Sequence, residues 1–315
     1  DLAFVGHSNS VRAVAFSPDG AQVMTGSDDA TARIWDAFTG ERIAILFHSS
    51  AVAAVGYTPN GSKLFTGTSF ANAVECKGRA RIWDAADVTA APYVFENALA
   101  PWCTVDYPRC IFSLAVSPDG SQLLSGQGWY DPFNAEYEGG AKLWDIATGE
   151  TRVAYCANTD WVNAVAYSPD GTRVVTGSAD KTAKIWEAAT GTLERTLSGH
   201  SRSVEAVSFS PDGRFVLTVA PTEGAWLWDI ATGTTVMTYG THANDAAFSP
   251  NGLYVATGGD SLQLWDAATG TELRTFVGNK ELVAAVAFSP DSNRIVAGGH
   301  DNTAFLWDIT DIAPD

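Results

Sequence analysis

The sequence predicts an all-β fold built from seven four-stranded antiparallel units, and two repeated features carry the prediction. A tryptophan followed by an acidic residue recurs seven times, roughly every 45 residues. Upstream of each pair lies a turn sequence of the form Ser/Thr-Pro-Asp/Asn-Gly, with Ser in place of Gly in the last copy. A fixed period in this range is typical of repeat architectures. The seven pairs begin at Trp35, Trp83, Trp144, Trp186, Trp228, Trp265 and Trp307.

Each unit contains the pattern of four short strands separated by turns. In the first unit an apolar segment (11–16) precedes the Pro-Asp-Gly turn, and a second strand (22–26) follows it. A third strand (31–35) ends in the tryptophan, and an Asp-x-x-Thr-Gly turn at 36–40 leads to a fourth. Pro presets the first turn dihedral and Gly accepts a positive φ, so these turns predict hairpins. The repeat therefore reads as one antiparallel blade, and residues 1–315 as one domain of seven blades.

The repeated segments give the chain a family resemblance. The segment Val-Thr-Gly-Ser-Ala-Asp-Lys-Thr-Ala-Lys-Ile-Trp at 175–186 recurs in register in the other units. Over nearly its whole length the chain resembles the WD-repeat β-propeller family. The resemblance implies a closed ring in which residues 2–5 supply the outer strand of the seventh blade, pairing the two ends of the chain. It also implies a non-enzymatic scaffold for protein interactions.

Histidine, hydroxyl and carboxylate residues recur around the tryptophans and suggest a hydrolytic triad. The first unit has all of them: His7, Thr25, Asp29 and Trp35. In the family that the chain resembles, this quartet is a structural hydrogen-bond chain. Buried ring N–H groups need acceptors, and repetition around a ring favours that structural role over catalysis. The predicted copies in blades four and five are Thr176, Asp180, Trp186, His200, Thr218 and Trp228.

Departures from the quartet predict blades that are less tightly held. Thr222 stands where blade five should have its carboxylate, and Asn158 and Asn279 stand where blades four and seven should have histidine. Ala297 takes the hydroxyl position of blade seven. Blade six has Thr257 and a displaced Asp260, and His242 lies nearby in a shortened loop. By this alignment only blade one has the complete set.

Composition and charge exclude several functions. The formal net charge of -17 opposes binding to nucleic-acid phosphates, which needs clustered Lys and Arg. Solubility or life at high ionic strength explains the acidic excess, and a basic partner is the alternative. No apolar run is long enough to span a membrane. No nucleophile elbow, metalloprotease helix motif, phosphate loop or dinucleotide fingerprint appears, so we expect no enzymatic activity, metal or cofactor.

Three insertions break the repeat in blades two and three, at about 68–78, 87–109 and 127–140. They are rich in aromatic residues, and we expect them on one face of the ring, as a partner-binding surface, a local mini-core or both. The predicted partner-binding residues are Trp102, Trp129, Tyr130, Phe133 and Trp161, with the acidic Asp131, Glu136 and Glu138.

The four cysteines fall in or near these insertions: Cys76, Cys103, Cys110 and Cys156. Disulfides, free thiols and a zinc site are the alternatives. Disulfides are favoured because they would pin long loops that lack strand pairing, and the absence of a Cys-x-x-Cys pair argues against zinc. Paired cysteines would imply a secreted or periplasmic protein, and unpaired cysteines a cytoplasmic one.

The predicted function is docking of a protein or peptide on the elaborated face of blades two to four. The alternatives are a ligand- or metal-binding, even hydrolytic, propeller that uses its central channel, or an accessory module of a larger protein. The apolar innermost strands at 11–16, 162–167 and 283–288 argue against the channel. The first residue, Asp1, is not Met, which leaves the module alternative open.

Overall fold

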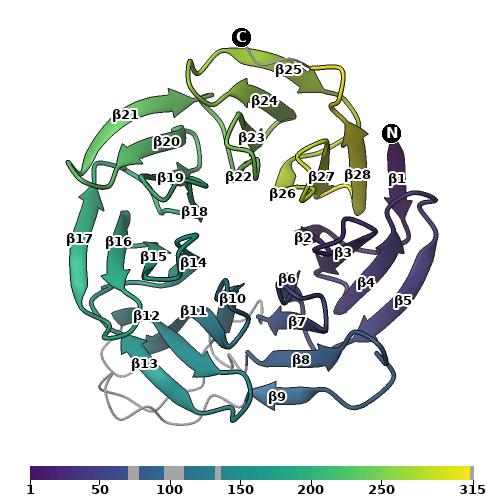
Figure 1. The fold of residues 1–315 in the computed structure, drawn as a ribbon, viewed down its shortest axis with the longest axis horizontal. Coiled ribbons are helices and arrows are strands. Elements are labelled where there is room, and N and C mark those ends of the chain that lie inside the picture. Colours follow the sequence, from purple (N-terminus) through teal and green to yellow (C-terminus); the bar gives the residue numbers. More distant parts are fainter. Residues whose placement is uncertain (70–77, 96–109, 132–135, 313–315) are drawn as a thin grey trace.

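Seven four-stranded antiparallel sheets surround a central channel as the blades of a propeller (Figure 1). The computed structural model describes residues 1–69, 78–95, 110–131 and 136–312. The strands are short and the turns between them carry the repeated Pro and Gly residues, as the sequence pattern requires. The predicted all-β, seven-bladed fold is confirmed.

Within a blade the strands follow chain order from the channel to the rim. Blade one contains β2 (Val11–Phe16), β3 (Gln22–Ser27), β4 (Thr31–Asp36) and β5 (Arg42–Phe47). Blade two contains β6 (Val52–Tyr57), β7 (Lys63–Thr68), β8 (Ala80–Asp84) and β9 (Tyr93–Phe95). Blade three contains β10 (Cys110–Val116), β11 (Gln122–Asp131), β12 (Glu136–Asp145) and β13 (Thr151–Tyr155). Blade four contains β14 (Val162–Tyr167), β15 (Arg173–Ser178), β16 (Thr182–Glu187) and β17 (Leu193–Ser198).

The remaining blades have the same order. Blade five contains β18 (Ala206–Phe209), β19 (Phe215–Ala220), β20 (Gly224–Asp229) and β21 (Thr234–Tyr239). Blade six contains β22 (Asp245–Phe248), β23 (Tyr254–Gly258), β24 (Leu262–Asp266) and β25 (Glu272–Phe276). Blade seven contains β26 (Val283–Phe288), β27 (Arg294–Gly299), β28 (Thr303–Asp308) and, from the other end of the chain, β1 (Leu2–Val5).

The ring closes through the N-terminal strand, as predicted. Strand β1 pairs antiparallel with β28, from Leu2 opposite Leu306 to Val5 opposite Thr303 (Figure 1). Phe4, in the middle of β1, is fully buried and lies 5.6 Å from the Trp35 ring of blade one. The first strand therefore completes one blade and packs against the next.

The hydrophobic core lies between neighbouring blades. One apolar cluster joins Val23 and Trp35 of blade one to Val296 and Leu306 of blade seven, and six similar clusters follow around the described part of the ring. The blades approach so closely that a Cβ added at Gly26 would lie 2.8 Å from the Val55 side chain of the next blade. Glycine at this strand position is therefore a packing requirement.

We call one face of the ring the top face. It carries the turn between the second and third strands of each blade (β3–β4 in blade one) and the connections between blades. The sequence places all three insertions there, but the structure differs from the prediction in two places. The segment 127–140 does not interrupt its strands, because β11 and β12 continue as one paired ladder as far as Asp131 opposite Glu136. The segment 87–109 contains β9, which is the fourth strand of blade two. Residues 70–77, 96–109 and 132–135 lie outside the described part of the chain.

Candidate functional site

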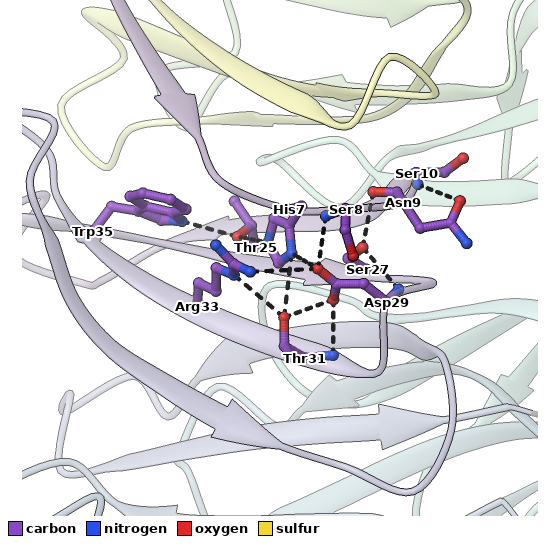
Figure 2. Close-up of polar contacts among 10 residues, drawn as sticks. All are labelled: His7, Ser8, Asn9, Ser10, Thr25, Ser27, Asp29, Thr31, Arg33 and Trp35. Atoms are coloured by element: carbon purple, nitrogen blue, oxygen red, sulfur yellow. Dashed lines mark hydrogen bonds and ion pairs between the residues drawn. The ribbon is translucent and has the colours of Figure 1, made fainter.

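The structure brings the four predicted residues of blade one into a single hydrogen-bond chain (Figure 2). His7 Nδ1 lies 2.9 Å from Asp29 Oδ2, and His7 Nε2 lies 2.7 Å from Thr25 Oγ1. Trp35 Nε1 donates to the same hydroxyl over 2.9 Å. A carboxylate only accepts, so Nδ1 carries the proton and the Thr25 hydroxyl donates to Nε2.

Burial and charge hold this chain in one protonation state. Burial lowers the pKa of His7, although the hydrogen bond to Asp29 opposes that shift. The Asp29 carboxylate accepts from the Thr31 hydroxyl, the His7 ring and the Ser8 N–H, and these outweigh its burial, so its pKa falls to about 2. Arg33 Nη2 lies 3.5 Å from the same carboxylate. At neutral pH the pair is therefore a neutral imidazole beside an ionised carboxylate.

Blade five forms the same chain with a different acid, so the expectation that only blade one is complete is wrong. His200 Nε2 lies 2.7 Å from Thr218 Oγ1, which accepts from Trp228 Nε1 over 2.8 Å. Glu223 Oε2 takes the role of the carboxylate, 2.7 Å from His200 Nδ1. Thr222 occupies the expected position but turns with a φ of 68°, and the longer side chain of the next residue reaches the imidazole.

In blade four an amide replaces the imidazole. Trp186 Nε1 donates to Thr176 Oγ1 over 3.1 Å, and that hydroxyl donates to Asn158 Oδ1 over 3.1 Å. The Asn158 amide nitrogen is buried without a hydrogen-bond partner. Asp180 does not face the amide but pairs with Lys184 Nζ at 2.7 Å, with both side chains almost buried.

Blade three has a substitute that sequence reasoning missed. Ser125 Oγ accepts from Trp144 Nε1 over 3.0 Å and from the amide of Gln127 over 2.7 Å. Gln127 is fully buried and reaches this hydroxyl from a position two residues along the same strand. The Gly126-Gln127-Gly128 segment looks uninformative in the sequence because the expected donor lies in the preceding connection.

This arrangement of groups offers no room for a reaction. Thr25, Ser125, Thr176 and Thr218 all have 0% exposure, so no substrate reaches their hydroxyls. Each described hydroxyl already accepts from a tryptophan. The geometry fits a buried polar connection between the top-face loops and the blade core.

A second feature lies at the top opening of the central channel. One residue from each blade, just before or at the start of the innermost strand, lines this opening. This mouth ring consists of Arg12, Ala53, Phe112, Asn163, Glu205, Asn244 and Ala284. The hollow above it has a volume of about 640 Å³, and a further 300 Å³ lies within the channel. Blades three to six therefore present aromatic, polar and acidic side chains to a channel that the sequence suggests is apolar.

Asp245 lies one residue deeper in the channel wall. Its carboxylate accepts from Ala246 N over 2.9 Å and from Val286 N of the next blade over 2.8 Å. Burial raises the pKa of Asp245 to about 6 despite these hydrogen bonds. Blade three has an uncharged counterpart, because Ser113 Oγ accepts from Val165 N over 3.2 Å.

The burial of Asp245 predicts a measurable pH dependence of stability. The folded protein holds this proton more tightly than the unfolded chain, whose pKa is near 3.8. Its contribution to the free energy of unfolding is therefore largest below pH 3.8 and falls, by up to about 3 kcal/mol, as pH rises through about 6. In urea unfolding, Asp245→Asn should gain stability relative to wild type between pH 4 and 7. Parallel pH profiles of the two proteins would contradict the assignment.

Of the predicted partner-binding residues, the structure describes the side chain of Trp161 alone. Its ring stacks on Phe112 of the mouth ring at 5.3 Å and 23°. The backbone of Gly128 lies against this indole, since a Cβ there would approach it to 2.4 Å. Trp129, Tyr130, Asp131, Glu136 and Glu138 lie in the extended β11–β12 ladder, where the backbone alone is described. Trp102 and Phe133 fall outside the described residues.

Cys110 and Cys156 are both disulfide-bonded. They lie at opposite sides of one sheet, Cys110 at the start of β10 and Cys156 directly after β13. Three strand spacings separate these sides by roughly 14 Å, beyond the reach of a disulfide. The two are therefore not bonded to each other. Cys76 and Cys103 lie outside the described residues, and the pairing of the four cysteines stays a prediction.

Within the described ranges, no group of three or more His, Cys, Asp or Glu side chains is placed to hold a metal ion. No helix with the length and apolar character of a membrane span occurs in the same ranges.

The blade geometry, the closing strand and the Trp-centred hydrogen bonds define a β-propeller of repeated blades. The family model "WD domain, G-beta repeat" matches residues 2–36, 149–187, 191–229, 233–266 and 270–308, more than half of the chain. The chain belongs to the WD-repeat family. The unmatched interval 37–148 spans the outer strand of blade one and all of blade two, together with the first three strands of blade three.

Curated relatives share part of the sequence. The chain is 28% identical over 189 residues to "Target of rapamycin complex subunit wat1" of Schizosaccharomyces pombe, which covers 58% of this chain and 52% of that protein. It is 35% identical over 182 residues to "Nuclear distribution protein PAC1" of Arthroderma otae, covering 58% and 36%. The chain thus spans about half or less of these relatives' lengths. Neither name denotes a catalytic activity.

Proposed function

We propose that this chain is a non-enzymatic scaffold that docks a protein or peptide on its top face, over blades two to four. The observation that carries the proposal is the stacked pair of Phe112 and Trp161 beside the channel mouth. Trp161 is partly exposed, and large aromatic side chains at the border of a hollow are the residue types that anchor interfaces. The WD-repeat fold and the name of the wat1 relative, a complex subunit, support a protein partner.

The hydrogen-bond chains support a structural role in this scaffold. They connect the top-face loops of blades one and five to buried tryptophans, so the loops have fixed positions relative to the blade core. A rigid surface loses little entropy on binding, which favours its use as a docking platform. The acidic surface fits a protein partner better than a nucleic acid, whose phosphates it would repel.

Replacing Trp161 by Ala should weaken capture of the native partner about thirtyfold, because loss of an aromatic anchor costs about 2 kcal/mol or more. The measurement is affinity capture from the source organism with quantitative mass spectrometry, followed by titration of the recovered protein. Phe38→Ala is the control, since Phe38 is a 68% exposed aromatic in the β4–β5 turn of the opposite face. If both variants weaken partner capture equally, the docking site does not depend on Trp161. If no partner is recovered, the scaffold proposal is contradicted.

A further inference from the structure

We propose that the outer strand of blade one, β5, pairs edge to edge with β5 of a second copy of this chain. The contact lies at the rim of the ring and is independent of docking on the top face. Three features of β5 support it: an unpaired backbone edge, an apolar outward face and a sequence that is complementary to itself.

The backbone of β5 is paired on one side only within the described part of the chain. The strand stands last in the sheet of blade one and pairs with β4. His48 N, directly after β5, donates to Ala30 O, directly before β4, over 2.9 Å. Successive residues of an antiparallel strand face opposite sides, so Phe47 and Ile45 direct their N–H and C=O groups away from β4, toward the open rim (Figure 1). An extended strand is the partner that satisfies such a row of donors and acceptors.

The side chains of β5 form two different faces. Leu46 is buried in the core between blades one and two, and Ala44 packs against the same cluster. The alternate residues Ile43, Ile45 and Phe47 lie on the other face, where Ile43 is 53% and Phe47 is 74% exposed. All five residues from Ile43 to Phe47 are apolar, so β5 leaves an uncharged hydrophobic surface at the rim.

The other outer strands have features that discourage edge-to-edge pairing. Strands β1 and β9 are short, with four and three residues, and threonine makes β21 more polar. Three further outer strands, β13, β17 and β25, contain charged residues: Arg152, Glu194, Arg195, Glu272 and Arg274. Beyond its first residue, Arg42, β5 has none of these features, which indicates that its edge is covered by another strand.

A second copy of the chain is complementary to this edge. When two β5 strands run antiparallel about a two-fold axis at Ile45, the Ile45 backbones exchange hydrogen bonds and each Ile43 lies opposite Phe47 of the other copy. No charged side chain meets another between these positions. Both strands are already extended, so little conformational entropy is lost on pairing. A two-fold contact uses the same surface on both copies and therefore closes at a dimer.

The dimer is expected to be weak. One strand on each side is less than the about 20–30 residues a side of a standard interface. Two chains of net charge -17 also repel each other. We therefore expect a dissociation constant of about 100 μM at physiological salt, which falls about threefold when about 0.5 M NaCl screens the repulsion. At the low micromolar concentrations of unfolding experiments the chain is then a monomer, in which Phe47 is exposed.

Sedimentation equilibrium of the whole chain from about 10 to about 500 μM measures this constant. Phe47→Glu and Ile43→Lys, both at exposed positions, should each weaken the dimer at least about tenfold, because each sets two charges against apolar side chains. The control is Val236→Glu, at a 50% exposed position of the outer strand β21. It changes the net charge as Phe47→Glu does and should leave the constant within about twofold.

Mixing the two variants tests the register. In a mixed dimer the lysine of Ile43→Lys faces the glutamate of Phe47→Glu, and the second pair remains Ile43 opposite Phe47. The mixture should therefore associate at least about fivefold more tightly than either variant alone.

Three results would overturn the proposal. The first is a chain that stays monomeric up to about 500 μM at both salt concentrations. The second is a dimer that Val236→Glu weakens as much as Phe47→Glu does. The third is a mixture of variants that associates no more tightly than its components, since the copies would then meet through another surface or register. Capture of a partner through Trp161 is measured separately, so either proposal can fail alone.

Discussion

Replacing Thr25 by Val is expected to lower the free energy of unfolding by about 3 kcal/mol. The two side chains have nearly the same shape, so little packing is lost. The hydroxyl, however, is the atom that both His7 Nε2 and Trp35 Nε1 contact, at 2.7 and 2.9 Å. Its removal leaves two buried polar groups without partners, and each such group costs about 1–3 kcal/mol.

A double-mutant cycle separates this effect from a general cost of Thr→Val. Once Trp35→Phe has removed the indole N–H, loss of the Thr25 hydroxyl leaves only the His7 ring without its hydrogen-bond partner. The two substitutions should therefore couple by about 1 kcal/mol or more in urea unfolding. Thr235→Val, at an exposed position of the outer strand β21, is the control. Additive single effects, or equal costs at positions 25 and 235, would show that the network contributes little.

The blades do not contribute equally to this network. Blade seven has Ala297 at the hydroxyl position, fully buried, so no hydroxyl there can serve the Trp307 indole. Instead Trp307 stacks with Phe305 at 5.7 Å and lies 5.6 Å from Phe276 of blade six. Aromatic packing and the closing strand thus stabilise the blade that lacks the polar chain.

The fold follows from the sequence because the same local pattern is repeated seven times. The polar networks are harder to predict because a hydrogen bond depends on the position of the donor or acceptor atom. Side chains of different lengths, from different sequence positions, can place such an atom at the same point. Glu223 reaches His200 from one residue beyond the expected position, with a side chain one methylene longer than Asp. Gln127 replaces an imidazole of the preceding connection from a position on β11, the same strand as Ser125. Spacing from the tryptophan identifies neither residue.

The channel mouth was missed for a related reason. The strands used to judge the channel, at 11–16, 162–167 and 283–288, are apolar over most of their length. The ring positions lie at or just before the strand starts, and Glu205 and Asn244 precede β18 and β22. Only the alignment of all seven blades in space shows that these residues form one opening.

Closure of the ring should depend on Phe4 more than on any polar group. Phe4→Ala is expected to lower the free energy of unfolding by about 3–5 kcal/mol, the usual cost of truncating a buried Phe. The side chain has 0% exposure and packs between blade seven and Trp35 of blade one. Its loss therefore weakens the outer strand of one blade and the contact with the next.

The chain supplies a matched control for this effect. Phe47 also lies on an outer strand, β5, but its side chain is 74% exposed, so Phe47→Ala should change the free energy of unfolding by less than about 0.5 kcal/mol. Urea unfolding of both variants gives the comparison. If the two cost the same, β1 is held by its backbone pairing with β28 and not by the buried ring. If Phe4→Ala costs much more than Phe47→Ala, the stability of the closed ring depends on the apolar contact between the first strand and blade one.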